Sequence, residues 1–178
     1  MTLTERARRI RLVLLDVDGV LTDGAILLGP KGTEHKRFHV RDGAAIVWAQ
    51  RAGLLTGLLS GRRAGATSAR AAQLAIPIVT QGRMDKAVAY ERILATHELD
   101  DQHVAYMGDD LLDLPVLRRV GLSAAPADAV DEVLRAVHWT STRAGGHGAV
   151  RELVELILKA QGRWETVVAE YDRKAARP

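Results

Sequence analysis

Residues 12–24, LVLLDVDGVLTDG, decide the fold and mark where its chemistry lies. The apolar run Leu12–Leu15 stops at Asp16, which is typical of a buried parallel strand followed by a polar loop. Because side chains alternate along an extended chain, Asp16 and Asp18 point to the same side. Two carboxylates on one side repel unless a cation lies between them or one is protonated. This all-oxygen pair favours a hard cation such as Mg²⁺.

Strand and helix signals alternate along the rest of the chain. Further strands are predicted at 54–59, 77–80, 104–107, 121–124 and 138–140, and helices at 42–52, 63–74, 85–97, 113–119 and 148–161. Asp42 and Asp85 are predicted to cap the helices that they begin. We expect one α/β domain over 1–178, a doubly wound parallel sheet in three αβα layers. It carries a small β-hairpin insertion at 25–39 and an amphipathic C-terminal tail at 163–178.

Composition excludes several classes of protein. The 178 residues are 47% apolar and include no cysteine, which excludes disulfides and thiolate metal sites. Residues 1–11 carry the whole net charge of +3, so we expect no basic face for nucleic acid. No apolar run approaches the about 18 residues that cross a membrane. The apolar run after the basic N-terminus is too short for a signal peptide, and a cytoplasmic protein is expected.

Polar clusters follow the strands at their carboxyl ends, where parallel sheets bind ligands. Ser60 and Gly61 follow strand 54–59, Asp109 follows strand 104–107, and Lys86 opens a helix between them. A hydroxyl, the N–H groups of a turn and a lysine can all hold a phosphoryl group. Each feature also has a plain alternative, helix capping for Ser60 and Asp109 and solvent exposure for Lys86. Their ordered coincidence favours one site.

The paired acids indicate phosphoryl transfer. Asp16 would attack a phosphorus atom and become an aspartyl phosphate. Asp18 would protonate the leaving oxygen and then activate water. The alternative for this motif alone is a loop with a helix cap.

Residues 10–162 resemble the haloacid-dehalogenase-like phosphatases that lack a separate cap domain, and among them the 3-deoxy-D-manno-octulosonate 8-phosphate phosphatases. The motifs that carry the resemblance are DVDGVLTDG at 16–24, FHVRDG at 38–43, SGR at 60–62, QGRMDK at 81–86, YMGDD at 106–110 and AGGHGAVRE at 144–152. The resemblance implies a Mg²⁺-dependent hydrolase of an acidic keto-sugar phosphate, acting in lipopolysaccharide precursor synthesis.

The same resemblance assigns roles to single residues. It implies that Asp16 is the nucleophile, that Asp18 is the acid and base, and that Ser60 and Lys86 hold the phosphoryl group. It also implies that Mg²⁺ is held by the Asp16 side chain, the Asp18 carbonyl and the Asp109 side chain. The two acids that complete this cluster are expected to support it: Asp110 and Asp113.

Substrate contacts are predicted at Thr22, Gly61, Arg62 and His147. A guanidinium matches a carboxylate, so Arg62 is expected to bind the sugar acid. Related enzymes for nine-carbon acids tend to have glutamate there, which favours the eight-carbon acid. His147 stands where the family often has arginine or lysine, and binding there would depend on pH. A turn role for the glycines around it stays open.

The spacing leaves no room for a lid domain between the motifs, so a partner subunit or a large substrate must cover the site. Similar phosphatases are tetramers, and a homotetramer is expected. Three alternatives remain: a phosphatase for a nine-carbon keto-sugar acid phosphate, a catalytically silent oligomerisation module, and a receiver-like signalling domain. The complete set of catalytic residues opposes the silent module, and Asp18 opposes the receiver.

Overall fold

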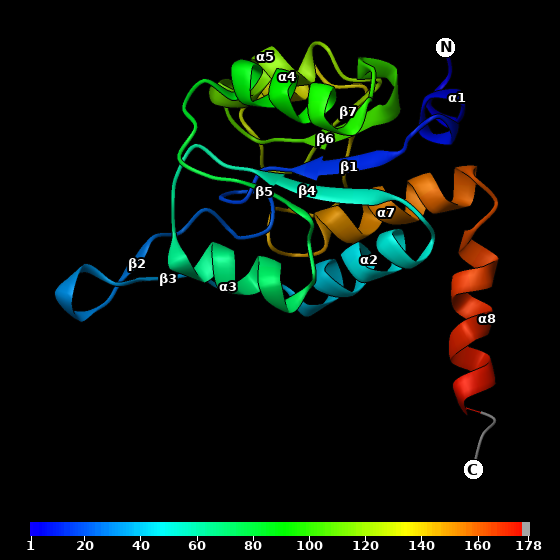
Figure 1. Ribbon diagram of the computed structural model, residues 1–178, viewed down its shortest axis with the longest axis horizontal. Coiled ribbons are helices and arrows are strands. Elements are labelled where there is room, and N and C mark those ends of the chain that lie inside the picture. The colour runs from blue at the N-terminus through cyan, green and yellow to red at the C-terminus, as the bar shows by residue number, and fades with distance from the viewer. Residues whose placement is uncertain (176–178) are drawn as a thin grey trace.

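The computed structural model describes residues 1–175. Its central sheet has six parallel strands in the order β5-β4-β1-β6-β7-β8 (Figure 1). The strands are β1 (Leu12–Leu15), β4 (Leu55–Leu59), β5 (Ile78–Thr80), β6 (Val104–Met107), β7 (Leu122–Ala125) and β8 (Trp139–Thr140). The register pairs Leu15 with both Leu58 and Met107. The carboxyl ends of the three central strands therefore open onto the same edge of the sheet.

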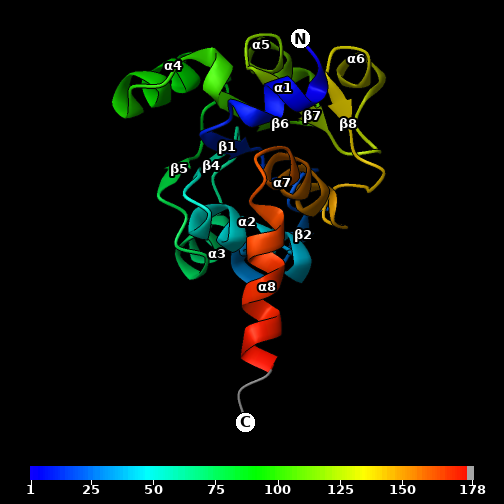
Figure 2. The ribbon, with the colours of Figure 1, turned by 90° about the vertical axis from the view of Figure 1, so that its right-hand side faces the viewer.

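Helices cover both faces of this sheet, which gives the three layers expected (Figures 1 and 2). One face carries α2 (Val40–Arg51), α3 (Gly65–Gln73) and α7 (Ala149–Ala160), with α1 (Leu3–Arg8) against α7. The other carries α4 (Lys86–His97), α5 (Leu114–Leu117) and α6 (Asp131–Leu134). In β1, Val13 and Leu15 enter the first core while Leu12 and Leu14 enter the second. Burial on both faces explains the unbroken apolar run.

The predicted hairpin is present but short. Its strands are β2 (Leu27–Leu28) and β3 (Glu34–His35), joined through the 3₁₀ turn η1 (Pro30–Gly32). Beyond His35 the chain leaves the ladder, and the Lys36 side chain turns inward to pair with Asp18 and Glu34. The hairpin extends away from the body of the molecule (Figure 1). The boundaries predicted for this insertion stay a prediction.

Of the two predicted helix N-caps, the structure confirms one and contradicts the other. Asp85 caps α4 as predicted, since its side chain accepts the Val88 N–H at 3.2 Å. The prediction that Asp42 is an N-cap is wrong. Helix α2 begins two residues earlier, after His39, and Asp42 lies buried in its first turn. Helices α1 and α6 were not predicted; a Thr2–Glu5 capping box begins α1.

The tail forms α8 (Trp164–Ala175), and residues 176–178 of the predicted tail lie outside the described part. Its first turn packs on α2, where the Trp48 and Trp164 rings meet edge to face at 5.7 Å. Farther along, α8 extends away from the layers (Figure 2). Within residues 1–175, no helix has the length and apolar character that spanning a bilayer requires.

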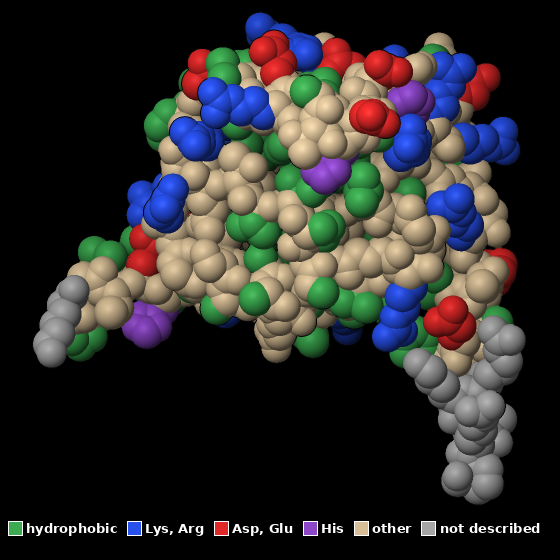
Figure 3. All heavy atoms as spheres, in the orientation of Figure 1, with side chains coloured by type: hydrophobic (Ala, Val, Ile, Leu, Met, Phe, Trp, Pro, Cys, Tyr) green, Lys and Arg blue, Asp and Glu red, His purple; other side chains and the backbone are tan. Residues whose placement is uncertain are grey.

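Charges are mixed on the face shown in Figure 3. Lys and Arg side chains are scattered there among Asp and Glu side chains. A face of this kind lacks the continuous basic stripe that follows a nucleic-acid backbone.

Candidate active site

The strand ends enclose a cavity of about 290 Å³. Its lining consists of Asp16, Asp18, Ser60, Gly61, Arg62, Met84, Lys86, Asp109, Asp110, Leu112 and Asp113. The first loop is anchored because the Asp16 N–H donates to the Met107 carbonyl at 3.0 Å. The structure therefore brings together every predicted catalytic and metal-binding residue, from four separate stretches of the chain.

Lys86 lies at the centre of this cluster. Its Nζ is 3.0 Å from Asp16 Oδ1 and 2.6 Å from Asp113 Oδ1, and its side chain is only 2% exposed. Burial of an ammonium is tolerated only where anions offset it, and here two do so. The pKa of Lys86 is raised by these two carboxylates, against the effect of burial. The solvent-exposed alternative for Lys86 is therefore wrong.

Asp113 is buried next to this cluster and supports it through hydrogen bonds. Its carboxylate accepts the N–H groups of Asp109 at 2.9 Å and Asp110 at 3.2 Å. It also accepts the Tyr106 hydroxyl and the Lys86 ammonium. Four donors occupy the oxygens of this fully buried carboxylate. Asp113 therefore fixes the loop and the lysine, as expected for a supporting acid.

The cluster of carboxylates in this cavity has the charge and the spacing to bind a divalent cation. Oxygens of Asp16, Asp109 and Asp113 lie within 4.8 Å of one another. Burial raises the pKa of Asp16 to about 7, against the attraction of Lys86. Burial, and then the charges of Asp16 and Asp113, raise the pKa of Asp109 to about 8. The buried Oδ1 of Asp109 has no hydrogen-bond partner within the described residues. An unpaired Asp109 oxygen beside other carboxylates offers the oxygen ligand and the negative charge that Mg²⁺ requires.

The hairpin supplies two residues that the sequence pattern did not predict for the site. Lys36 forms ion pairs with Asp18 and with Glu34, the latter at 2.9 Å, and its side chain is 2% exposed. Arg62 donates to Glu34 at 2.8 Å, and its Nε is 4.0 Å from Asp18. Glu34 belongs to β3 and Lys36 directly follows the end of that strand, and their ion pair places both side chains on one side of the segment. Their spacing in the sequence, the same as between the two catalytic acids, is the signal that identifies them.

Ser60 lies where a phosphate ligand is needed. Its side chain is buried, and its Oγ accepts the Arg62 N–H at 3.2 Å, so the hydroxyl proton is free to donate toward the cavity. Helix α3 begins only after Ala64, which shows that the capping alternative for Ser60 is wrong. Gly61 follows it along the same wall.

Two predicted substrate-binding residues do not line this cavity. The Thr22 Oγ1 accepts the N–H groups of Gly19 at 3.4 Å and Gly24 at 3.2 Å, and it is buried inside the loop. Thr22 therefore shapes the loop instead of facing a ligand, because its hydroxyl satisfies backbone groups there. His147 has its Nδ1 2.7 Å from the Gly145 carbonyl. Substrate binding by His147 stays a prediction.

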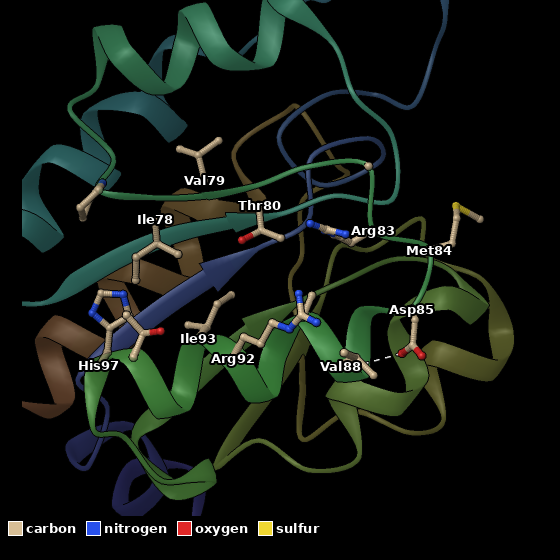
Figure 4. A pocket seen from close by; sticks show the side chains of 14 residues that line it. Ile78, Val79, Thr80, Arg83, Met84, Asp85, Val88, Arg92, Ile93 and His97 are labelled. Carbon is tan, nitrogen blue, oxygen red and sulfur yellow. Dashed lines mark hydrogen bonds between the residues drawn. The ribbon is translucent and has the colours of Figure 1, made fainter.

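A larger cavity of about 640 Å³ lies elsewhere, along the outer edge of β5. Figure 4 shows Ile78 and Thr80 of β5 facing Arg92 and Ile93 of α4 across it. It shares only Met84 with the catalytic cavity. The one carboxylate on its wall belongs to the residue that caps α4. The acid cluster, and with it the chemistry, belongs to the smaller cavity.

Comparisons with known proteins agree with this geometry. Residues 69–153 match the haloacid dehalogenase-like hydrolase family. The chain is 46% identical over 161 residues to the 3-deoxy-D-manno-octulosonate 8-phosphate phosphatase of Yersinia pestis, covering 90% of this chain and 86% of that protein. It is 43% identical over 158 residues to the corresponding Escherichia coli K12 phosphatase, covering 89% and 84%.

Solved structures agree as well. The Moraxella catarrhalis phosphatase, solved with a magnesium ion, a phosphate ion and a KDO molecule, superposes with a TM-score of 0.93 at 34% identity, covering 95% of this chain and 97% of that chain. The Yersinia pestis enzyme gives 0.90 at 45% identity, covering 92% and 88%. The chain therefore belongs to the 3-deoxy-D-manno-octulosonate 8-phosphate phosphatase family of haloacid dehalogenase-like hydrolases.

Proposed function

We propose that this chain is a magnesium-dependent phosphatase that hydrolyses 3-deoxy-D-manno-octulosonate 8-phosphate to the free sugar acid and phosphate. One observation carries the proposal. A buried lysine joins the nucleophile candidate Asp16 to a carboxylate cluster in a single cavity, in a chain 46% identical to a phosphatase of that name. Such an enzyme would serve the synthesis of lipopolysaccharide precursors.

The reaction would proceed in two steps. An Asp16 oxygen attacks the phosphorus atom, so that one P–O bond forms while the bond from phosphorus to the sugar oxygen breaks. Asp18 gives its proton to the departing sugar oxygen. In the second step Asp18 takes a proton from water, whose oxygen attacks phosphorus and releases the Asp16 carboxylate. Lys86, 3.0 Å from Asp16 Oδ1, holds the nucleophile in place for both steps.

The metal ligands would be the Asp16 side chain, the Asp109 side chain and the backbone carbonyl of Asp18. When bound, Mg²⁺ would offset the charge of the carboxylates and of the phosphoryl oxygens. Ser60 and the N–H groups that follow it would donate to those oxygens. Arg62, already paired with the Glu34 carboxylate, would bind the carboxylate of the sugar acid.

We further propose a cytoplasmic homotetramer. The hairpin carries three apolar side chains, Ile26, Leu27 and Leu28, that are at least half exposed. Exposed apolar groups gathered on an extended element favour a protein interface. The residues between Asp18 and Ser60 are used by the hairpin and α2, which supports a cover supplied by another subunit. A chain without cysteine suits a reducing compartment.

The test is turnover of matched eight-carbon and nine-carbon acid phosphates, measured as phosphate release with Mg²⁺. The proposal predicts a clear preference for the eight-carbon substrate, reduced in an Arg62→Glu variant. Equal rates on both would remove the role given to Arg62. Faster phosphate release from the nine-carbon acid phosphate would make that compound the substrate. Phosphate release from neither compound would indicate a catalytically silent module.

A further inference from the structure

Two motifs that the reaction does not use meet in the fold. FHVRDG at 38–43 supplies Asp42, and AGGHGAVRE at 144–152 supplies the start of α7. The Asp42 carboxylate accepts the Gly148 N–H at 3.1 Å and the Arg151 N–H at 2.8 Å. Asp42 is 1% exposed. A contact across more than a hundred residues thus joins α2 to the N-terminus of α7.

Helix α7 depends on this contact because its own N-cap residue has no side chain that could accept a hydrogen bond. Its N-cap is Gly148, which has no side chain and lies at φ +109°, a conformation that side-chain-bearing residues rarely adopt. Free N–H groups at a helix start are normally satisfied by a neighbouring Ser, Thr, Asp or Asn. Here the acceptor comes from another helix. The positive end of the α7 dipole also favours a carboxylate at this place.

The segment held by this cap packs backbone to backbone on the catalytic loop. A Cβ on Gly145 would lie 1.8 Å from the Gly19 carbonyl oxygen, and one on Gly146 would lie 2.6 Å from the Thr22 carbonyl carbon. The Gly146 N–H donates to the Val20 carbonyl at 2.9 Å. Only glycine fits at this distance, so the two segments move together.

The catalytic loop also touches a predicted metal ligand. A Cβ on Gly19 would lie 2.0 Å from Asp109 Oδ2. Gly19 therefore lies in close contact with both the Gly145 backbone and the Asp109 carboxylate. A displacement of the glycine segment reaches Asp109, and the loop that carries Asp18, through direct contacts.

We propose that Asp42 is a positioning residue for the magnesium site. By capping α7, Asp42 fixes the position of residues 145–148. These residues pack on the loop 17–23 and so determine how close that loop lies to Asp109. The proposal rests on the proposed function only for its kinetic readout, because the placement of metal ligands is measurable on the enzyme alone. Residues that orient metal ligands typically contribute about 10–100-fold to metal affinity.

The test compares Asp42→Asn with a matched control, Ile157→Ala. The asparagine keeps the size of the side chain but can accept only through one oxygen, so one N–H of α7 loses its acceptor. Ile157 is buried in the same helix and far along it, so its truncation weakens α7 without touching the cap. Calorimetric titration of metal-free protein with Mg²⁺ gives Kd, and steady-state phosphate release gives kcat and KM.

We expect Asp42→Asn to raise the Kd for Mg²⁺ by about 10–100-fold. Its kcat falls at low Mg²⁺ and recovers at saturating Mg²⁺, while KM for the sugar phosphate is unchanged. Ile157→Ala lowers Tm but keeps the wild-type Kd. Gly145→Ala, whose Cβ would press on Gly19 directly, is expected to raise the Kd for Mg²⁺ in the same way. It serves as the test variant if Asp42→Asn does not fold.

A wild-type Kd in a folded Asp42→Asn or Gly145→Ala variant, with only Tm lowered, would reduce the cap to a structural contact and overturn the proposal. Failure of the proposed function looks different. Wild-type protein would then bind Mg²⁺ yet release no phosphate from the eight-carbon substrate, and the Kd comparison would still decide the role of Asp42.

Discussion

We predict that replacing Lys86 by methionine destabilises the protein and disables the nucleophile together. Methionine nearly matches the length of lysine but carries no charge. The change leaves Asp16 and Asp113, now 3.0 Å and 2.6 Å from the Lys86 ammonium, without their shared cation. It also leaves the Tyr106 hydroxyl, 3.3 Å away, with one neighbour fewer.

The size of the effect follows from the geometry. At 3.0 Å and an effective dielectric constant of about 20, two unit charges attract by about 5.5 kcal/mol. The side chain is 2% exposed, so solvent screens this little. Breaking a buried pair by removing one partner costs about 3–5 kcal/mol. Because Lys86 lowers the pKa of Asp16, its loss favours the protonated acid, and the penalty is smaller at pH 5 than at pH 8.

The assay is urea unfolding of metal-free protein at both pH values, with Lys159→Met as control. Lys159 forms an exposed ion pair with Glu155, so its loss is expected to cost under about 1 kcal/mol. With Mg²⁺ and substrate, kcat of Lys86→Met is expected to fall by about 10²–10³-fold, as for other lost charge-stabilising donors. A loss of stability no larger than the control's, together with a kcat close to wild type, would refute the role given to Lys86.

Three further predictions concern the nucleophile, the acid cluster and α8. Asp16→Asn abolishes phosphate release while circular dichroism and Tm stay near wild type, and full activity would end the covalent mechanism. Burial raises the pKa of Asp16 to about 7 and that of Asp109 to about 8, so both carboxyls bind protons more tightly in the folded chain. The unfolding free energy of metal-free protein therefore falls as pH rises from about 4 to about 8. Adding Mg²⁺ reduces the slope of unfolding free energy against pH. A double variant, Asp16→Asn with Asp109→Asn, removes most of that slope. Trp164→Ala removes the ring that meets Trp48 edge to face and lowers the unfolding free energy in urea by about 1–3 kcal/mol; an unchanged value would show that α8 adds nothing to the core.

The sequence predicted the strands that matter most for the site. Strands β1 and β6 have the predicted bounds, because an apolar run buried on both faces ends where the polar loop begins. With those ends fixed, the rule for parallel sheets brought Asp16, Ser60 and Asp109 to one edge. Local pattern was sufficient there because strand register is set by burial.

Other features depended on contacts that local pattern does not contain. The burial of Lys86 comes from Asp113, 27 residues later. Asp42 follows a helix-start pattern, yet its N–H partners lie 106 and 109 residues away. Thr22 turned inward because the loop after β1 needs a hydroxyl for its own N–H groups. The inward turn of Lys36 depends on Asp18, which lies 18 residues earlier in the chain.

The covalent mechanism requires that the carboxylate at position 16 take the phosphoryl group. Acid quenching of enzyme during turnover with Mg²⁺ and the sugar phosphate, followed by borohydride reduction, converts an aspartyl phosphate to homoserine, which peptide mass spectrometry locates. We predict homoserine at position 16 and at neither Asp18 nor Asp109. Homoserine at another aspartate, or a phosphate burst with unmodified Asp16, would contradict the account.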